Sequence, residues 1–265
     1  MNVLQQIFAL KKTELEATKR ILPMTALLRS LSVTPPRFLS ALKKPGPVVV
    51  AEFKRTSPLG GVISANGNVE QIASAYASAG AVALSVLTER RFFGGSEEDL
   101  KRAKKACRLA VLRKDFIFDQ YQILEAKSWG ADAVLLIAAM LTDAKLSTLL
   151  LACRKWALDA VVEVHSKGEL ERALAFGADI VGVNNRDLKT MRVDVKTSFE
   201  LAEGMDGHTV FVSESGIESP QVALELFQAG YKGFLIGTHF MRQPDPGKEL
   251  KKFLTELRKL TNVKN

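Results

Sequence analysis

Short apolar runs alternate along this chain with longer stretches in which apolar residues recur at helical spacing. The runs are rich in β-branched residues, which is typical of buried strands, and the longer stretches are typical of amphipathic helices. Strands are predicted at residues 48–54, 81–87, 109–114, 131–137, 159–165, 179–184, 209–213 and 233–236. Helices are predicted to follow them at residues 69–79, 96–107, 121–129, 146–157, 167–176, 196–203, 220–229 and 247–260.

Strands that alternate with helices in this way predict a parallel sheet with right-handed crossovers. Eight such units in a chain of 265 residues favour the α/β class and a closed (β/α)8 TIM barrel. An open, doubly wound sheet is the competing architecture, and it usually carries a glycine-rich phosphate loop after its first strand. Residues 54–61 read KRTSPLGG instead, which is no dinucleotide-binding fingerprint. We therefore expect the barrel.

Residues 1–47 lie outside this rhythm and are predicted to form an N-terminal helical extension. Apolar residues recur at helical spacing over 2–20, and a second short helix is predicted over 24–31. A segment of this length is too short to build a core of its own. We therefore expect a single domain, in which residues 1–47 cap a catalytic barrel formed by residues 48–265.

The composition restricts where the chain works and what it binds. The formal net charge is +8, but the basic residues are scattered without interleaved aromatic residues, so we expect a solvated surface and no nucleic-acid partner. Cys107 and Cys153 are the only cysteines, which excludes a disulfide framework and suits a reducing cytoplasm. The sequence shows neither a secretory signal nor a membrane helix. It is compatible with a monomer.

Charged and polar side chains cluster at the carboxyl ends of several predicted strands. Alternate side chains of a barrel strand point into the barrel, and this alternation places Glu52 and Lys54 inward on the first strand. It also points Lys114 inward from the third strand, Glu163 from the fifth and Asn184 from the sixth. Because active sites of this fold lie at this rim, we interpret these residues as an acid–base site. The alternative is a buried ion-pair network that only closes the barrel.

Phosphate binding is predicted after the seventh and eighth strands. Glu214, Ser215 and Gly216 follow the seventh strand, and Gly237 and Thr238 follow the eighth. Small residues with free backbone N–H groups at these two places are what this fold uses to hold a phosphate. The alternative is that the glycines serve only to form turns.

Two further features have less specific interpretations. His165 is interpreted as a hydrogen-bonded histidine at a strand end, although a proton shuttle beside Glu163 is an alternative. Phe92 and Phe93 either form an apolar wall over an aromatic substrate or belong to a loop that simply packs. His208 and His239 lack partners at metal-ligand spacing, so we expect no zinc or iron site.

These motifs together resemble those of indole-3-glycerol-phosphate synthases, in the family's order and over nearly the whole chain. They read EFKRTSP at 52–58, FFGGS at 92–96, LRKDF at 112–116, EVH at 163–165, NNRDL at 184–188, ESGI at 214–217 and LIG at 235–237. Each motif is moderately specific, and seven in register are a strong signal. Two positions depart from the family pattern: Leu59 stands where a serine is common, and Thr238 where Ser or Glu is more usual. A phosphate held by backbone groups would tolerate both changes.

The resemblance implies a carboxy-lyase of tryptophan biosynthesis that needs no cofactor and acts on an anionic small molecule. The reaction closes the ring of 1-(2-carboxyphenylamino)-1-deoxyribulose 5-phosphate, with loss of carbon dioxide and water, to give indole-3-glycerol phosphate. By resemblance, Lys114 is the general acid that protonates the substrate carbonyl, and Lys54 engages the substrate carboxylate. Glu163 would act in the later dehydration as general base or acid. Glu52 and Asn184 would support that second step.

The resemblance also implies a set of residues that contact the substrate. Apolar members would line the aromatic pocket, small and hydroxyl-bearing members would hold or adjoin the phosphate, and a basic member would orient the substrate near the rim. The residues implied are Ser57, Phe93, Phe116, Arg186, Glu214, Ser215, Gly216, Leu235, Gly237 and Thr238.

Two other functions remain to be weighed. Phosphoribosylanthranilate isomerase is another phosphate-binding barrel of the same pathway, but it needs a Cys and Asp pair, and both cysteines here lie in predicted helices. A barrel that had lost its chemistry and serves as a binding protein is the non-enzyme alternative. Loss of Lys114 or Glu163 would have favoured it, and both residues are present.

Overall fold

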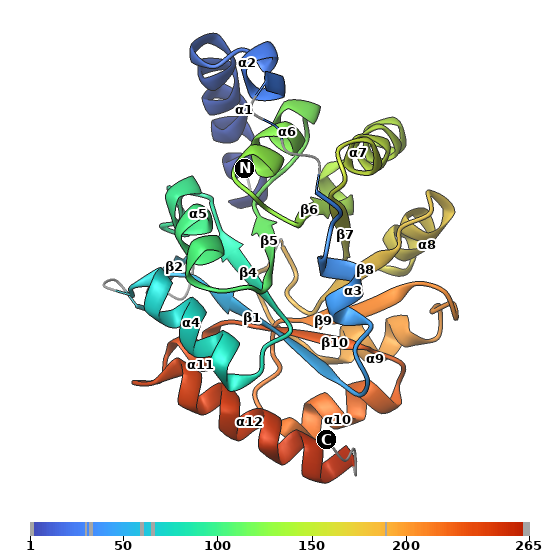
Figure 1. Ribbon diagram of the computed structural model, residues 1–265. Helices are drawn as coiled ribbons and strands as arrows, with labels where there is room; N and C mark the ends of the chain where they lie inside the picture. Colours follow the sequence, from blue (N-terminus) through green and yellow to red (C-terminus); the bar gives the residue numbers. More distant parts are fainter. Residues whose placement is uncertain are drawn as a thin grey trace.

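The computed structural model describes residues 3–29, 31, 34–58, 61–64, 67–188 and 190–261. Eight parallel strands close into a barrel in the order β1-β10-β9-β8-β7-β6-β5-β4 (Figure 1). The barrel strands are β1 (Val48–Phe53), β4 (Ala83–Leu87), β5 (Ala110–Lys114), β6 (Ala133–Ile137), β7 (Asp159–Val164), β8 (Ile180–Asn184), β9 (Val210–Glu214) and β10 (Gly233–Ile236). The predicted (β/α)8 architecture is confirmed, with strand ends that shift by one or two residues.

Eight helices surround the barrel, as predicted. They are α4 (Val69–Ala79), α5 (Glu97–Ala106), α6 (Gln120–Ser128), α7 (Asp143–Lys155), α8 (Lys167–Ala175), α9 (Lys196–Ala202), α10 (Pro220–Gln228) and α12 (Pro246–Thr261). Several begin where a side chain accepts from the first free N–H groups, as Ser96 does for α5 and Asp119 for α6. These caps fix where the loops before the capped helices end.

Three small elements in the loops were not predicted. A two-stranded hairpin, β2 (Thr56–Ser57) with β3 (Gly61–Val62), follows β1. A 3-10 turn, η1 (Ala138–Met140), follows β6, and a short helix, α11 (Thr238–Met241), follows β10. Each is too short for a periodic pattern, because periodicity needs several residues to become visible.

The alternation of side chains along the strands follows the prediction. Val48 and Val50 of β1 pack inside the barrel with Leu112 and Val161. Val49, Ala51 and Phe53, which point the other way, belong to the larger core between the strands and the helices. The inward side of each strand therefore runs up to the polar residues at the carboxyl-terminal mouth.

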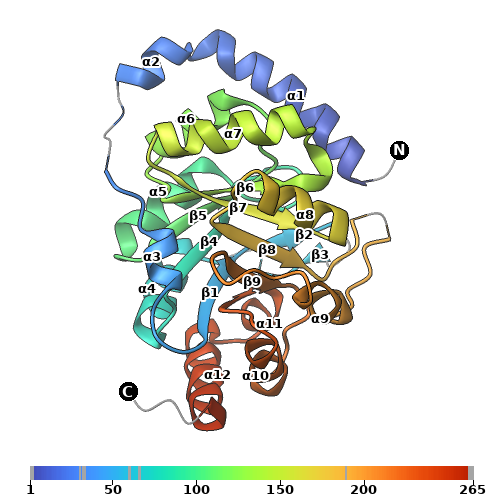
Figure 2. The same ribbon diagram turned by 90° about the vertical axis from the view of Figure 1, so that its right-hand side faces the viewer.

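The N-terminal helices reach both ends of the barrel. α1 (Val3–Ile21) and α2 (Met24–Arg29) lie over α6, where Leu15 and Leu27 pack against its apolar face (Figure 2). Ile7 of α1 joins the core at the barrel mouth. α3 (Phe38–Leu42) packs at the amino-terminal ends of the strands, where Leu42 approaches Gly233. The helix predicted over 24–31 is observed as α2 and ends at Arg29; residue 30 lies outside the described residues, and Leu31 is not helical. Among the residues that are described, no helix is both long and apolar enough to cross a membrane.

Candidate active site

A cavity of about 280 Å³ opens at the carboxyl ends of the barrel strands. Side chains from α1, from seven of the eight barrel strands and from the loops that follow them form its walls. The predicted site residues that line it are Glu52, Lys54, Ser57, Phe93, Lys114, Phe116, Glu163, Asn184, Arg186, Ser215, Gly216, Leu235, Gly237 and Thr238. The tertiary structure thus brings together every predicted site residue except Glu214 around one cavity.

Lys114, at the end of β5, lies at the centre of the charged groups. Its ammonium nitrogen Nζ donates to the Glu214 carboxylate and lies 3.5 Å from Glu52 Oε2 and 4.0 Å from Glu163 Oε2. Burial lowers the pKa of Lys114, but the three carboxylates outweigh burial and raise this pKa above its usual value. The side chain therefore carries a proton at neutral pH.

Glu52, on β1, is held as a carboxylate by two lysines. Its Oε1 lies 2.9 Å from Lys54 Nζ, and its Oε2 accepts a hydrogen bond of 3.2 Å from the Ser85 hydroxyl. Burial alone would raise the pKa of Glu52, yet Lys54 and Lys114 lower it to about 2. Lys54 is thereby tied to the barrel wall at a position where it also faces the cavity.

Glu163, on β7, has a histidine behind it. His165 Nε2 lies 3.4 Å from Glu163 Oε1, and its Nδ1 lies 3.3 Å from Glu169 Oε2 of α8. Burial lowers the pKa of His165, but the two glutamates outweigh burial and raise it to about 10. The pKa of Glu163 is lowered, because His165 and Lys114 outweigh its burial. The backbone N–H of His165 also donates to Glu169, at 2.8 Å, as the interpretation of a hydrogen-bonded strand-end histidine requires.

Glu214 is the one predicted site residue that lies beneath the cavity instead of lining it. Its side chain is fully buried and accepts from Lys114 through Oε2, while Oε1 has no hydrogen-bond partner among the described residues. Burial raises the pKa of Glu214 to about 7, against the attraction of Lys114. On the neighbouring strand, a Cβ added at Gly182 would lie 2.3 Å from Glu214 Oε1. Gly182 lies two residues before the inward-pointing Asn184, so alternation along β8 turns it inward as well, and the Glu214 carboxylate occupies the space that a side chain there would fill.

The loops after β9 and β10 present small residues to the cavity. Ser215 and Gly216 both adopt left-handed backbone conformations, with φ of 67° and 76°. The Ser215 hydroxyl donates to Asn184 Oδ1 at 2.9 Å, which joins this loop to the end of β8. A Cβ at Gly237 would lie 2.6 Å from Glu52 Oε1, so only glycine lets the loop after β10 come this close. Ser57 and Thr238 also line the cavity, whereas Leu59 lies outside the described residues.

Another part of the wall is apolar. Phe93 and Phe116 stand with ring centroids 6.1 Å apart, and Leu235 joins them from β10. Leu4 and Ile7 of α1 complete this wall, and sequence reasoning missed them as site residues. Their apolar spacing was visible in the sequence, but it predicted only a packed helix.

Arg186 and the cysteines complete the account of the predicted residues. The Arg186 backbone N–H donates to Asn184 Oδ1 at 3.0 Å, and its guanidinium donates to the Met191 carbonyl, also at 3.0 Å, beside the cavity. Cys107 follows α5, and Cys153 is a buried residue of α7 itself. In the described part of the chain, no group of three or more His, Cys, Asp or Glu residues is arranged to hold a metal ion.

Comparisons with known proteins agree with this geometry. Residues 4–253 match the family model described as indole-3-glycerol phosphate synthase. A protein of that name from Bacteroides thetaiotaomicron is 41% identical over 255 residues, which are 96% of this chain and 98% of the relative. Another, from Caldanaerobacter subterraneus subsp. tengcongensis, is 43% identical over 256 residues, or 97% and 99% of the two chains.

Solved structures of lower identity share the fold. The crystal structure of 3-hexulose-6-phosphate synthase from Salmonella typhimurium superposes with a TM-score of 0.64 at 14% identity, over 80% of this chain and 99% of that one. Thiamine phosphate pyrophosphorylase from Pyrococcus furiosus gives 0.58 at 19% identity, over 82% and 95%. At these identities the likeness supports the barrel and carries no argument about the reaction.

Proposed function

This chain belongs to the indole-3-glycerol phosphate synthase family, and we propose that the cavity at its barrel mouth performs the family's ring closure with Lys114 as the general acid. The protein is an indole-3-glycerol phosphate synthase, a carboxy-lyase of tryptophan biosynthesis, and its substrate carries both a phosphate and a carboxylate. What we propose is the part that each residue plays.

The substrate has an aromatic end and a phosphate end, and the cavity has walls that suit both. We place the carboxyphenyl ring against Phe93, Phe116 and Leu235, which form the apolar wall. We place the phosphate at the small residues after β9 and β10, where backbone N–H groups can bind its oxygens. The ketose carbons then lie between these ends, beside Lys114 and Glu163.

In the first step, the aromatic carbon that bears the carboxylate attacks the ketose carbonyl carbon. Lys114 donates a proton to the carbonyl oxygen, which becomes a hydroxyl group, and the new carbon–carbon bond closes the ring. Lys54 pairs with the substrate carboxylate and holds it beside the reacting carbon until the carbon–carboxylate bond breaks. Carbon dioxide leaves, and its bonding electrons restore the aromatic ring. This step takes up one proton, which the solvent returns to Lys114.

In the second step, the new hydroxyl leaves as water. A proton must leave the adjacent carbon while the hydroxyl accepts one, so the site needs a base and an acid together. Glu163 serves as the base, because its lowered pKa keeps it a carboxylate in the free protein. Glu52 holds Lys54 in place as the proton donor to the leaving hydroxyl. Asn184 lies beside Glu163 and supports the reacting group.

The observation that carries this proposal is the Lys114 ammonium nitrogen within 4.0 Å of three carboxylates that come from three other strands. The test is to add the substrate to purified protein, without added metal or cofactor, and to follow the indole fluorescence of the product. The wild type should form product, and the Lys114→Met variant should not. Lys12→Met, at an exposed lysine of α1, is the matched control and should keep the wild-type rate. Absence of product with the folded wild type would overturn the proposal.

The competing isomerase is not favoured by the position of the two cysteines. Cys153 is buried within α7, and Cys107 follows α5, so neither supplies the cysteine of the Cys and Asp pair that such a reaction needs at the barrel mouth. Every residue used in the two steps comes from one chain. We therefore propose that a monomer is competent and that no macromolecular partner is required.

A further inference from the structure

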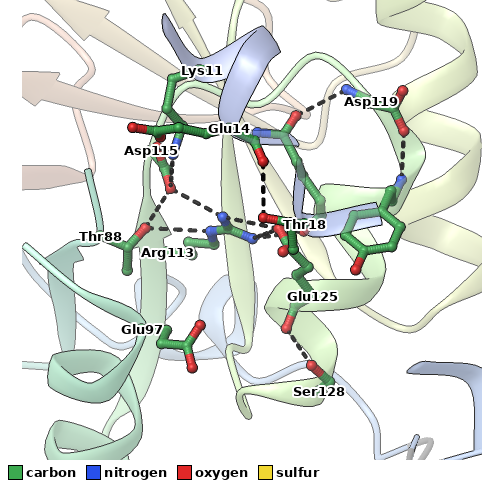
Figure 3. A network of polar contacts seen from close by, with 12 residues as sticks. Lys11, Glu14, Thr18, Thr88, Glu97, Arg113, Asp115, Asp119, Glu125 and Ser128 are labelled. Carbon is green, nitrogen blue, oxygen red and sulfur yellow. Dashed lines mark hydrogen bonds and ion pairs between the residues drawn. The ribbon is translucent and has the colours of Figure 1, made fainter. Parts of the chain in front are cut away.

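A second cluster of charged residues lies outside the cavity, between α1 and the end of β5. Figure 3 shows Lys11 of α1 reaching Asp115, which also contacts Thr88 and Arg113. None of these four residues has a part in the two chemical steps. Asp115 nevertheless follows Lys114 directly in the sequence and borders both the active-site cavity and a second cavity of about 300 Å³.

Asp115 is buried and uses both carboxylate oxygens. Lys11 Nζ lies 2.9 Å from Oδ1 and 3.1 Å from Oδ2. Oδ2 also accepts from the Thr88 hydroxyl at 2.7 Å and from Arg113 Nη2 at 3.0 Å, and Oδ1 accepts from the Phe116 backbone N–H at 2.8 Å. The last of these bonds ties the Asp115 side chain to the backbone of the next residue, directly after Lys114.

Arg113 fixes the far side of this cluster. It is 2% exposed and donates to the Gln122 carbonyl at 2.9 Å, and its guanidinium lies 3.3 Å from Glu125 and 4.0 Å from the Trp129 ring centroid. α6 and β5 are therefore held rigidly together, whereas Lys11 is the contribution of the N-terminal helix. Among the described residues, Lys11 is the one ion-pair partner of Asp115 that comes from outside the barrel.

The two neighbours of Asp115 both face the active site. Lys114 and Phe116 line the cavity, because side chains alternate across the end of β5. A rotation of the backbone at Asp115 would change the direction of both side chains at once. The hydrogen bonds that hold Asp115 therefore also set the positions of the proposed general acid and of part of the aromatic wall.

We propose that Asp115 is a positioning residue for Lys114 and Phe116, and that Lys11 couples the docking of α1 to that function. The inference rests on the function proposed above, since it assigns a supporting role to the site around Lys114. α1 then contributes in two separable ways. Leu4 and Ile7 form part of the cavity wall and affect substrate binding, whereas Lys11 affects the chemical step through Asp115.

The primary test is steady-state kinetics of Lys11→Met, Lys11→Arg and Ile7→Ala beside the wild type. We expect Lys11→Met to lower kcat about tenfold with KM changed less than about twofold, because misplacement of a catalytic group mainly slows the reaction. Lys11→Arg keeps the ion pair and should restore kcat to within about twofold of the wild type. Ile7→Ala should raise KM more than it lowers kcat. Lys12→Met is the control for charge.

A second arm tests whether Lys11 acts through Asp115. In the double variant Lys11→Met/Asp115→Asn, kcat should fall no further than in Asp115→Asn alone, because the effects of substitutions at two residues in direct contact do not add. Thr88→Val removes a hydrogen bond to Asp115 without touching α1, and it should also lower kcat more than it changes KM. It serves in place of Asp115→Asn if that variant does not fold, as judged by circular dichroism.

Several outcomes would overturn the inference. Folded Lys11→Met and Thr88→Val with kcat within about twofold of the wild type would exclude a positioning role. If Lys11→Met raised KM without lowering kcat, as expected for Ile7→Ala, α1 would contribute only to the substrate-binding wall of the cavity. Additive losses in the double variant would separate Lys11 from Asp115. These outcomes can be read only when the wild type is active and Lys114→Met is inactive, so they would overturn the inference and leave the proposed function intact. An inactive wild type would instead overturn the proposed function.

Discussion

The Nζ atom of Lys114 and the Oε2 atom of Glu163 lie 4.0 Å apart in the barrel mouth. Each group has another charged partner behind it: Glu214 for the lysine and His165 for the glutamate. At neutral pH one therefore holds a proton and the other lacks one. Two neighbouring groups in opposite protonation states can act as acid and base on the same substrate.

The first prediction separates these two groups. Lys114→Met should lower kcat about 100- to 10,000-fold, because the carbonyl oxygen loses its proton donor. Glu163→Gln keeps the shape of the side chain but removes the base, so the ring-closed, decarboxylated intermediate should accumulate before dehydration. Rapid quenching followed by mass spectrometry would detect it as a species one water heavier than the product. Product formation by Glu163→Gln at the wild-type rate would contradict the assignment.

The second prediction concerns the pH dependence. The pKa of Glu214 is raised to about 7, whereas that of Glu52 is lowered to about 2, so Glu214 titrates near neutral pH and Glu52 stays ionised. Below about pH 7, Glu214 takes up a proton and loses its ion pair with Lys114. We expect kcat/KM to fall on this acid side with an apparent pKa near 7. The Glu214→Gln variant should lose that inflection, whereas the pH dependence that comes from titration of the substrate phosphate should remain. If the wild type and Glu214→Gln showed the same decrease of kcat/KM at low pH, Glu214 would not be the group that causes this decrease.

The third prediction tests the space reserved for Glu214. In Gly182→Ala, the new Cβ would lie 2.3 Å from Glu214 Oε1, so the carboxylate must move and Lys114 with it. Turnover should fall at least about tenfold, and the free energy of unfolding should fall by about 1–3 kcal/mol, as overpacking usually does. Gly168→Ala is the matched control, since nothing lies within 4 Å of its added Cβ. It should keep activity, and a tolerated Gly182→Ala would contradict the geometry.

The fourth prediction concerns stability. The pKa of His165 is raised from 6.5 to about 10 by Glu163 and Glu169, so its stabilising effect is fully present below pH 6.5 and is lost as pH rises through about 10. We expect His165→Gln to lower the free energy of unfolding by about 1–3 kcal/mol at pH 6. The loss should be smaller at pH 10 than at pH 6. Urea unfolding at both pH values measures the difference, with the exposed His208→Gln as control. An equal loss at both pH values would exclude the ion pairs as its cause.

The elements that the sequence predicted well are those that follow strict periodicity. The residues of α4 and β10 match their predicted ranges, because a buried strand or an amphipathic helix repeats its pattern over several residues. Alternation along β1 also predicts Glu52 and Lys54 at the mouth, where both line the cavity. The hairpin of β2 and β3 and the short α11 were missed, since two to four residues carry no period.

The sequence by itself determined the barrel, the inward direction of Lys114 and Glu163, and the small residues at the proposed phosphate end, because local periodicity and strand parity depend only on order along the chain. It did not determine how these groups pair. That Glu214 lies under Lys114, that Gly182 makes room for it, and that Lys11 reaches Asp115 depend on distances between segments far apart in sequence. Closure of the barrel and docking of α1 set those distances, and with them the protonation state of each group.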